Sequence, residues 1–325
     1  MSAPDRPNDA IWIEAGLLDP SAPHADERRE LLAFLTEQGL TLATMVEACE
    51  QQQLVTVAGD RLLRPGHMFT VDELARRAGM DDLEFVTELR TASGFPPSPP
   101  DEPACTDDDV EMFRLFELAS EVFSRQELLH FVRALGGSMR RIAEAAAEMF
   151  LRDVEATQHV ERATELERAL TNIQAIELGS AATAVFAPMF RAHLVLAIGD
   201  ARRARRHHHD YETTPFTVGF VDLTGFTARA GASSPAELLR LVTWFEATAH
   251  DLVTSHGGRL VKLIGDEVMF ATVEPDQGCS IALALTRIAD MPARGGLAHG
   301  QVVTSGGDLY GPVVNLAARG LMMYG

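Results

Sequence analysis

The stretch Phe220-Val-Asp222-Leu-Thr-Gly225-Phe226-Thr227 decides the fold of the second half of the chain. It completes an apolar run, 216–221, that predicts a buried strand, and Asp222 comes where that strand ends. Gly225 then permits a tight turn, whose backbone amides can bind phosphate. The candidate phosphate-binding residues of this turn are Thr224, Gly225, Phe226 and Thr227.

Short β-type runs alternate with helical segments from residue 214 onward. In chain order the expected elements are strand 216–221, helix 235–255, strand 259–264, strand 267–273, helix 278–291 and strand 296–303. Gly265-Asp266, between the second and third strands, is a hairpin signal. This order predicts an α+β ferredoxin-like (palm) domain over 214–325, an antiparallel sheet with helices on one face.

Residues 1–210 are predicted to form an all-α domain, because apolar residues recur there at helical spacing. The segments with this spacing are 26–38, 41–52, 71–78, 107–123 and 128–151. A last long helix enters the basic run 202–206, which places the joint with the second domain near 200–213. A proline-rich segment, 96–100, interrupts the helical region as a stiff linker.

The composition excludes several classes of protein. The 325 residues carry a formal net charge of −19, which disfavours binding to nucleic acid and to anionic membranes. Three widely spaced cysteines fit no metal or disulfide pattern, and the N-terminus lacks an apolar signal core. The most apolar stretch, 181–198, is interrupted by Pro188, Arg191 and His193, so no membrane span is expected. We therefore expect a cytoplasmic protein.

Two carboxylates stand at neighbouring strand ends of the predicted sheet. Asp222 follows the first strand, and Asp266 lies at the tip of the hairpin formed by the next two. Carboxylates in such positions can bridge two hard cations, Mg²⁺ or Mn²⁺, which prefer oxygen ligands. The alternative is that Asp222 caps a helix and Asp266 forms a turn beside Gly265.

Asn315 and Arg319 are four residues apart, which places them on one face of a helix. An amide at this spacing can orient a ribose, and a guanidinium can neutralise charge on a reacting phosphate. An incidental pair on a surface helix is the alternative.

Three downstream segments complete the pattern: Lys262-Leu-Ile-Gly-Asp266, Asp308-Leu-Tyr-Gly311 and Asn315-Leu-Ala-Ala-Arg319. With them, residues 214–319 resemble the catalytic domain of the class III adenylate cyclases. The resemblance implies a phosphorus–oxygen lyase that converts ATP into 3′,5′-cyclic AMP and pyrophosphate. It also implies a homodimer with two shared active sites, each with two divalent metal ions, Mg²⁺ or Mn²⁺.

The resemblance assigns a role to each candidate residue. Asp222 and Asp266 are the implied metal ligands, and Asn315 and Arg319 the implied catalytic residues. Lys262 and Asp308 are the implied adenine-binding pair, because a lysine donor and a carboxylate acceptor complement N1 and the N6 amino group of adenine. For this pair the alternative is a solvated strand lysine and a turn aspartate.

The resemblance is incomplete at its end. The sequence stops soon after Arg319, and Gly320 stands where the family normally has an apolar residue, so the catalytic domain is expected to be C-terminally truncated. An alternative function is a catalytically inactive, cyclase-like module that binds nucleotide and signals through dimerisation.

The two-domain layout resembles actinobacterial cyclases in which a helical N-terminal domain regulates catalysis. His207, His208 and His209 are the candidate pH switch, because the neighbouring arginines disfavour the charged imidazolium until the medium is mildly acidic. A solvated joint without a sensing role is the alternative. Six apolar residues on the long helices could line a pocket for a small apolar or lipid effector, or form a helix-dimer core: Met139, Met149, Phe150, Phe186, Met189 and Phe190.

The segment 69–79 resembles the helix-turn-helix of MerR-type transcription regulators, with Gly79 at the turn. The helix that would read DNA carries four acidic residues, 81, 82, 84 and 88, against Arg90. This charge is wrong for phosphate, so we expect a packing module that does not bind nucleic acid.

Overall fold

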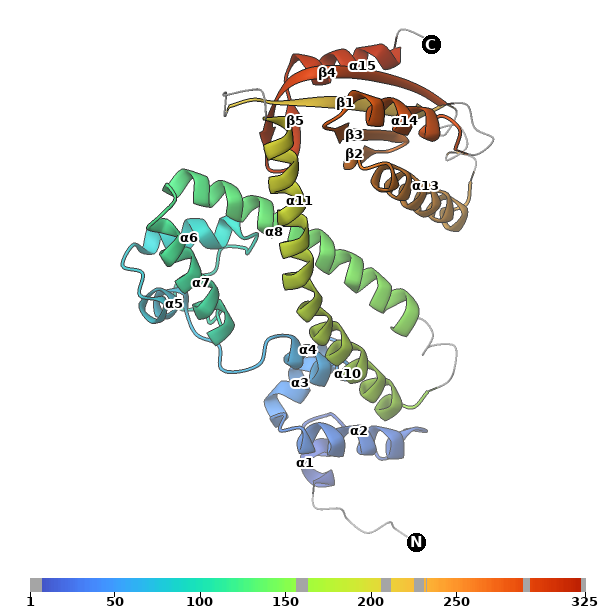
Figure 1. Cartoon of the computed structure of the whole chain (residues 1–325). Coiled ribbons are helices and arrows are strands. Elements are labelled where there is room, and N and C mark those ends of the chain that lie inside the picture. The colour runs from blue at the N-terminus through green and yellow to red at the C-terminus, as the bar shows by residue number, and fades with distance from the viewer. Residues whose placement is uncertain are drawn as a thin grey trace. The chain divides into compact units, whose positions relative to one another are not determined.

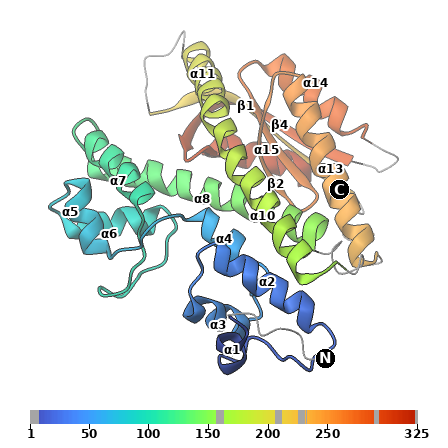
Figure 2. The ribbon, with the colours of Figure 1, turned by 90° about the horizontal axis from the view of Figure 1, so that it is seen from below.

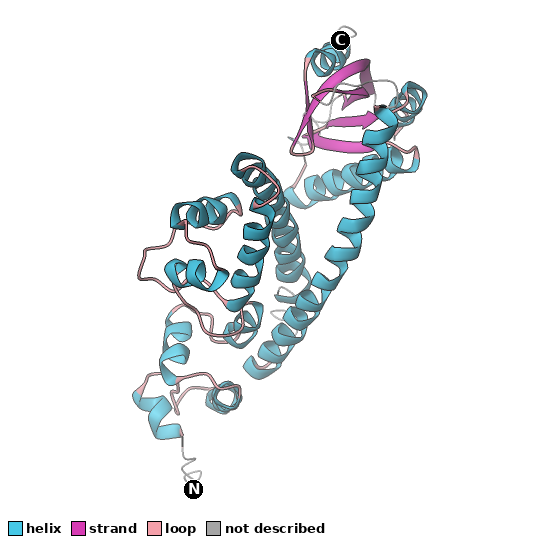
Figure 3. Cartoon of the chain, turned by 60° about the vertical axis from the view of Figure 1, so that its left-hand side comes forward, coloured by secondary structure: helices cyan, strands magenta, loops and turns pink. Residues whose placement is uncertain are grey.

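The chain forms two compact units, Met1–Pro188 and Met189–Gly325, in a computed structural model (Figure 1). The structure describes residues 8–155, 163–205, 212–224, 231, 233–288 and 293–322. The strands belong to the second unit, as the colouring by secondary structure shows (Figure 3). The domain boundary expected near residue 210 stays a prediction.

The described residues of the first unit form helices, joined by turns and one isolated β-bridge between Phe69 and Cys105. The helices are α1 (Asp9–Glu14), α2 (Ala25–Glu37), α3 (Leu42–Glu50), α4 (Val57–Leu63), α5 (Val71–Ala78), α6 (Leu83–Ala92), α7 (Asp107–Ser120), α8 (Arg125–Phe150), the π-turn η1 (Leu151–Glu155), α10 (Glu165–Ala182) and the 3₁₀ turn η2 (Thr183–Val185). The two longest begin at capping boxes, Ser124 with Glu127 for α8 and Thr164 with Glu167 for α10. That this unit regulates catalysis stays a prediction.

Two separate hydrophobic cores hold the first unit together. Leu31, Leu32 and Leu35 of α2 are fully buried in the first core, which Ala169 of α10 joins. Arg28 of α2 also donates two hydrogen bonds of 2.6 Å to Glu165, the first residue of α10. The second core is built by α5, α6, α7 and α8.

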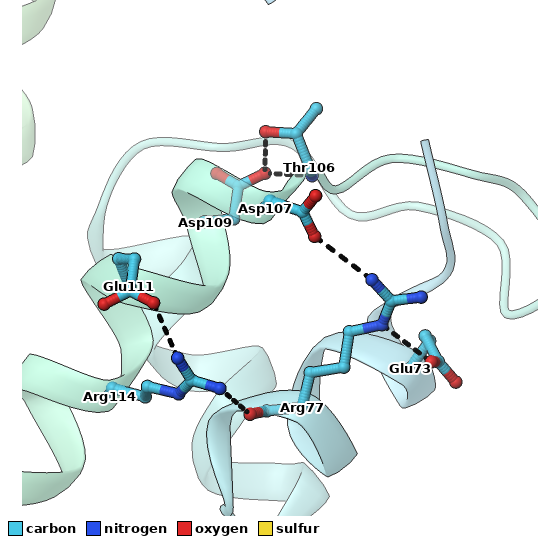
Figure 4. Close-up of polar contacts among 7 residues, drawn as sticks. All are labelled: Glu73, Arg77, Thr106, Asp107, Asp109, Glu111 and Arg114. Carbon is cyan, nitrogen blue, oxygen red and sulfur yellow. Dashed lines mark hydrogen bonds and ion pairs between the residues drawn. The ribbon is translucent and has the colours of Figure 1, made fainter. Parts of the chain in front are cut away.

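The segment with helix-turn-helix character folds as α5 and α6 around Gly79, whose φ of +78° favours glycine. Arg125 of α8 donates hydrogen bonds of 2.9 Å to both Asp82 and Glu88, two of the acidic side chains on or beside α6. Arg77 bonds to Glu73 and Asp107 and so joins α5 to α7 (Figure 4). The charged side chains of this segment thus form ion pairs with one another and with neighbouring helices of the first unit.

A long apolar helix runs through the end of the first unit into α11 (Phe186–Ala204). Within the described part of the chain, the helix Glu165–Ala204 is long and apolar enough to cross a bilayer, judged by length and composition alone, and its apolar window is not buried. The absence of a membrane span therefore stays a prediction. Among the six apolar residues considered for an effector pocket or a helix-dimer core, Met139 and Met149 of α8 and Phe190 of α11 are exposed, which leaves both interpretations as predictions.

The second unit contains an antiparallel sheet with the strand order β2-β3-β1-β4-β5. Its elements after α11 are β1 (Thr214–Leu223), α13 (Pro235–Ser255), β2 (Arg259–Ile264), β3 (Glu267–Thr272), α14 (Pro275–Leu285), β4 (Ala293–Ser305), β5 (Asp308–Tyr310) and α15 (Pro312–Met322). The order β4-β1-β3-β2 is that of the expected ferredoxin-like palm. The helix expected over 278–291 begins earlier, because Pro275 suits the first turn of a helix, and it ends at Leu285.

Helices cover both faces of this sheet, and the expectation of helices on one face was wrong. Phe245 of α13 and Ile281 of α14 pack against Val221 and Phe270 on one face. On the other face Ala317 of α15 joins a separate core with strand residues of β1, β3 and β4. The two layers are seen above and below the strands in Figure 1, and from another side in Figure 2. The physical reason is that β1 is apolar on both faces over 218–221, and each face needs a cover.

The packing of α8 on the end of α6 depends on a glycine. A Cβ at Gly136 would overlap the backbone carbonyl group of Ser93, whereas a Cβ at Gly137 would meet nothing within 4 Å. We predict that Gly136→Ala lowers the free energy of unfolding of the first unit by about 1–3 kcal/mol, because backbone cannot yield as a side chain can. Urea unfolding followed by circular dichroism measures the change.

Gly137→Ala is the matched control, since it adds the same methyl group in the same helix at an exposed position. It should be neutral or stabilising by up to about 1 kcal/mol, because alanine favours helix over glycine. Equal effects of the two substitutions would contradict the packing explanation.

Candidate active site

The end of β1 lies beside the tip of the β2–β3 hairpin. Asp222 pairs in register with Glu267, and the N–H of Leu223 donates a 3.2 Å hydrogen bond to the carbonyl oxygen of Asp266. Gly265 has a φ of +64°, which permits the tight turn before Asp266. The structure therefore brings Asp222 and Asp266 to neighbouring positions, as the sequence predicted.

Arg294 and Glu267 are two further charged residues beside Asp222, and sequence reasoning missed both. Arg294 of β4, opposite Asp222 in the register, donates hydrogen bonds of 3.0 and 3.2 Å to its Oδ2 atom. Burial raises the pKa of the Glu267 carboxyl above its ordinary value of 4.5, and the nearby Asp222 and Asp266 carboxylates raise it further. The available signals were the acidic residue directly after Asp266 and an arginine just before the expected last strand.

The chemistry of these donors fits a hard divalent cation. The Asp222 side chain is only 16 % exposed, and its partner Arg294 shows that this carboxylate is balanced by positive charge. Among the described residues no group of three or more His, Cys, Asp and Glu side chains is arranged to hold a metal. The carboxylate oxygens of Asp222 and Asp266 are nevertheless of the kind that Mg²⁺ and Mn²⁺ prefer, so this pair could hold such ions.

A second pair of site residues, Lys262 of β2 and Asp308 of β5, forms an ion pair. The Lys262 Nζ atom lies 2.6 Å from Oδ2 of Asp308, and the N–H of Leu309 donates to the other carboxylate oxygen at 2.8 Å. Partial burial raises the pKa of Asp308, but the bonds from Lys262 and Leu309 outweigh it and bring the pKa below its ordinary value of 3.8. Asp308 is therefore ionised at neutral pH and is more than an incidental turn residue.

Arg259 supports the turn that carries Asp308. It lies three residues before Lys262, and its Nη1 atom donates a 2.9 Å hydrogen bond to the carbonyl oxygen of Gly307. Gly307 has a φ of +88°, a backbone conformation that favours glycine. The β2 strand therefore holds the β4–β5 turn at two points.

Asn315 and Arg319 lie on α15 with exposed side chains, while Ala317 between them faces the sheet. Within the described residues, no hydrogen bond or ion pair joins either side chain to Asp222 or Asp266. The chain therefore presents the six predicted residues as two close pairs and one exposed helix face.

Gly320 has a structural role, because a Cβ there would lie 3.2 Å from the Cα atom of Gly296 of β4.

Some predicted residues cannot be placed. Thr224 is an exposed turn residue, and Gly225, Phe226 and Thr227 lie outside the described residues. The candidate pH switch, His207, His208 and His209, also lies outside them.

Comparison with known proteins gives relatives over most of the chain. The chain is 32% identical over 318 residues to an uncharacterized protein of Mycobacterium tuberculosis, covering 94% of this chain and 80% of that protein. It is 31% identical over 258 residues to an adenylate cyclase of Streptomyces coelicolor, covering 77% of this chain and 66% of that enzyme. No family model matches the chain.

Among solved structures, the guanylyl cyclase domain of a rhodopsin fusion protein from Blastocladiella emersonii aligns with 34% of this chain and 75% of its own. The sequence identity is 22% and the TM-score 0.32.

The Lys262–Asp308 pair predicts a pH-dependent contribution to stability. Because the folded-state pKa of Asp308 is lowered, its contribution is present above about pH 4 and is lost as the pH falls through the folded-state value. Asp308→Asn should lower the free energy of unfolding by about 0.5–1 kcal/mol at pH 7, since the pair is partly exposed. Urea unfolding at a series of pH values measures the difference, which should shrink as the pH falls below about 4.

Glu246→Gln serves as the control, because Glu246 is exposed on α13 and forms no ion pair with the described residues. A pH-independent effect of Asp308→Asn would show that the lost ion pair is not its cause.

Proposed function

We propose, from the premise that the chain belongs to the class III adenylate cyclases of actinobacterial type, that it converts ATP into 3′,5′-cyclic AMP and pyrophosphate. The observation that carries the proposal is the combination of two pairs on one sheet. Asp222 lies beside Asp266, and Lys262 is bonded to Asp308. Each pair has the chemistry that one part of ATP requires.

The carboxylates of Asp222 and Asp266 would hold the divalent ions. The chemistry that two such ions supply when bound is activation of the ribose 3′-hydroxyl and neutralisation of the pyrophosphate leaving group. The Nη2 atom of Arg294 lies 3.0 Å from Oδ2 of Asp222, so its positive charge balances the charge of this carboxylate. Its guanidinium, placed next to a metal ligand, is also suited to phosphate oxygens, which it can bind through two parallel N–H groups.

Base selection rests on the second pair. The Asp308 carboxylate, kept ionised by Lys262, accepts from the N6 amino group of adenine, and the Lys262 ammonium donates to N1. The pair can stay bonded while it does so, because an ammonium has three donors and a carboxylate about four acceptor positions. Guanine instead has a donor at N1, which would face the Lys262 donor, and an acceptor at position 6, which would face the Asp308 acceptor. We therefore assign ATP over GTP.

A second copy of the chain would complete each site. Asn315 and Arg319 are exposed on α15 and make no described contact with the carboxylate pair of their own chain. In a head-to-tail homodimer, Lys262, Asp308, Asn315 and Arg319 of one chain would meet the metal ligands Asp222 and Asp266 of the other. Asn315 would there orient the ribose, and Arg319 would neutralise the reacting phosphate. Two equivalent sites follow from the twofold symmetry.

The proposal is tested by mixing two inactive variants. Asp222→Ala should abolish cyclic AMP formation because it removes a metal ligand, and Arg319→Ala should lower kcat by at least about 100-fold because it removes charge stabilisation in the transition state. After exchange of subunits, about half of the dimers contain one intact site, so activity should return to about a quarter of wild type. Cyclic AMP is quantified with Mn²⁺ and with Mg²⁺, using ATP and GTP in parallel.

The control is a mixture of Asp222→Ala with Asp266→Ala, whose heterodimers have no intact site and should stay inactive. Absence of activity in the wild-type chain under all conditions would instead favour an inactive module that binds nucleotide. Equal activity in both mixtures would contradict the shared site.

We also propose that the helical unit regulates catalysis and that pH acts at the joint. The three histidines 207–209 stand beside Arg202, Arg203, Arg205 and Arg206, so their protonation adds repulsion there. Replacing all three by Asn should flatten the change in cyclase activity between about pH 5.5 and 7.5, because Asn cannot be protonated in this range. An unchanged pH profile of cyclic AMP formation would identify the joint as a solvated linker without a sensing role.

A further inference from the structure

A cavity of about 550 Å³ lies within the second unit, between the last turn of α11 and the edge of the sheet. Its lining includes three arginines, Arg203 and Arg205 at the end of α11 and Arg259 at the start of β2. Neither Lys262 nor Asp308 lines it. It is also distant from the carboxylate pair: Thr214 lines it, and Asp222 is eight residues farther along β1, about 26 Å at the rise of a strand.

The charges around the cavity leave it positive. Three arginines face two acidic residues, Asp200 and Glu274, which gives one net positive charge. Asp200 forms an ion pair with Arg203, so a bound anion would compete with Asp200 for this guanidinium. The Glu274 side chain is exposed. Arg259 forms no ion pair with a carboxylate of the described residues, and its bond to Gly307 is to a neutral carbonyl group. Burial lowers the pKa of its guanidinium, and the charges of Asp200 and Asp308 only partly offset this.

The N-terminus of α14 also borders the cavity, and its helix dipole is partly offset by the acidic residues Glu274 and Asp276. Glu274 is the N-cap residue, and with Gln277 of the first turn it lines the cavity. Pro275, the first residue of this 11-residue helix, has no N–H group, and the Glu274 side chain makes no capping hydrogen bond, so the amides of Asp276 and Gln277 are not satisfied by the cap. Such amides and the helix dipole favour an anion.

We propose that this cavity binds a small phosphate-bearing molecule, held by Arg203 and Arg259 and by the first turn of α14. Guanidinium groups match phosphate oxygens geometrically, and the volume is that of a pocket for a small organic molecule, larger than one phosphate ion. The cavity adjoins the Lys262–Asp308 pair through Arg259 and Gly307, but neither residue of the pair lines it. The proposal therefore holds whether or not the chain makes cyclic AMP. The opposing explanation is that the arginines only fasten α11 to the sheet.

The test measures binding to the full-length protein without nucleotide or divalent cations, so that the catalytic site has no metal to attract phosphate. Inorganic phosphate and ribose 5-phosphate are titrated by calorimetry against chloride and acetate at constant ionic strength. We expect both phosphates to bind, with ribose 5-phosphate tighter, and acetate not to bind. Phosphates that bind no better than chloride would overturn the proposal, and acetate binding as well as phosphate would overturn the assignment of the ligand class.

Substitutions locate the site. Arg259→Gln should weaken phosphate binding by about tenfold or more, because a charge-assisted pair of hydrogen bonds is lost. Arg203→Gln is the second variant and should weaken it too; its side chain is 53% exposed, so this change does not threaten folding. Arg287→Gln, an exposed arginine away from the cavity, is the matched control and should bind as wild type. Unchanged binding in both cavity variants would overturn the proposal.

Discussion

The pairing of β1 with β3 on one side and β4 on the other is the constraint on which the second unit depends. This strand is buried over 217–221, and its backbone hydrogen bonds fix the register of both neighbours. Because register determines which side chains are opposite, the same pairing sets Asp222 beside Glu267 and Arg294. The candidate metal site is therefore a consequence of how the central strand is paired.

The site is built by collecting like charges and offsetting them locally. Asp222, Asp266 and Glu267 lie near one another at the end of β1, and the pKa of Glu267 is raised mainly by burial and further by the two neighbouring carboxylates. Arg294 offsets part of this charge. A site that concentrates negative charge at a cost in stability is suited to binding cations, since a bound ion relieves the repulsion. A cationic partner likewise stabilises the negative charge of Asp308, because Lys262 lowers the pKa of this carboxyl.

Sequence reasoning predicted the ferredoxin-like order of elements and the proximity of Asp222 to Asp266, because both depend on local features: a buried run, a glycine turn and the residues at strand ends. Lys262 and Asp308 were singled out by the family resemblance alone. It missed Arg294, whose role depends on a strand partner 72 residues away. It also placed all helices on one face, although the run Val218-Gly-Phe-Val221 has apolar residues pointing to both faces. The α14 helix was displaced by a few residues because the signal of Pro275 was not used.

The sequence by itself determined the chemistry of the candidate site: Asp222, Asp266, Lys262, Asp308, Asn315 and Arg319 carry it whatever their neighbours. Only the tertiary structure decided which of them meet within one chain. Lys262 on β2 and Asp308 on β5 form an ion pair although their strands stand at opposite ends of the strand order, whereas Asn315 and Arg319 are exposed on α15. The physical reason is that side-chain identity is local, but distance depends on the pairing of strands and on the face to which each helix turns its apolar side.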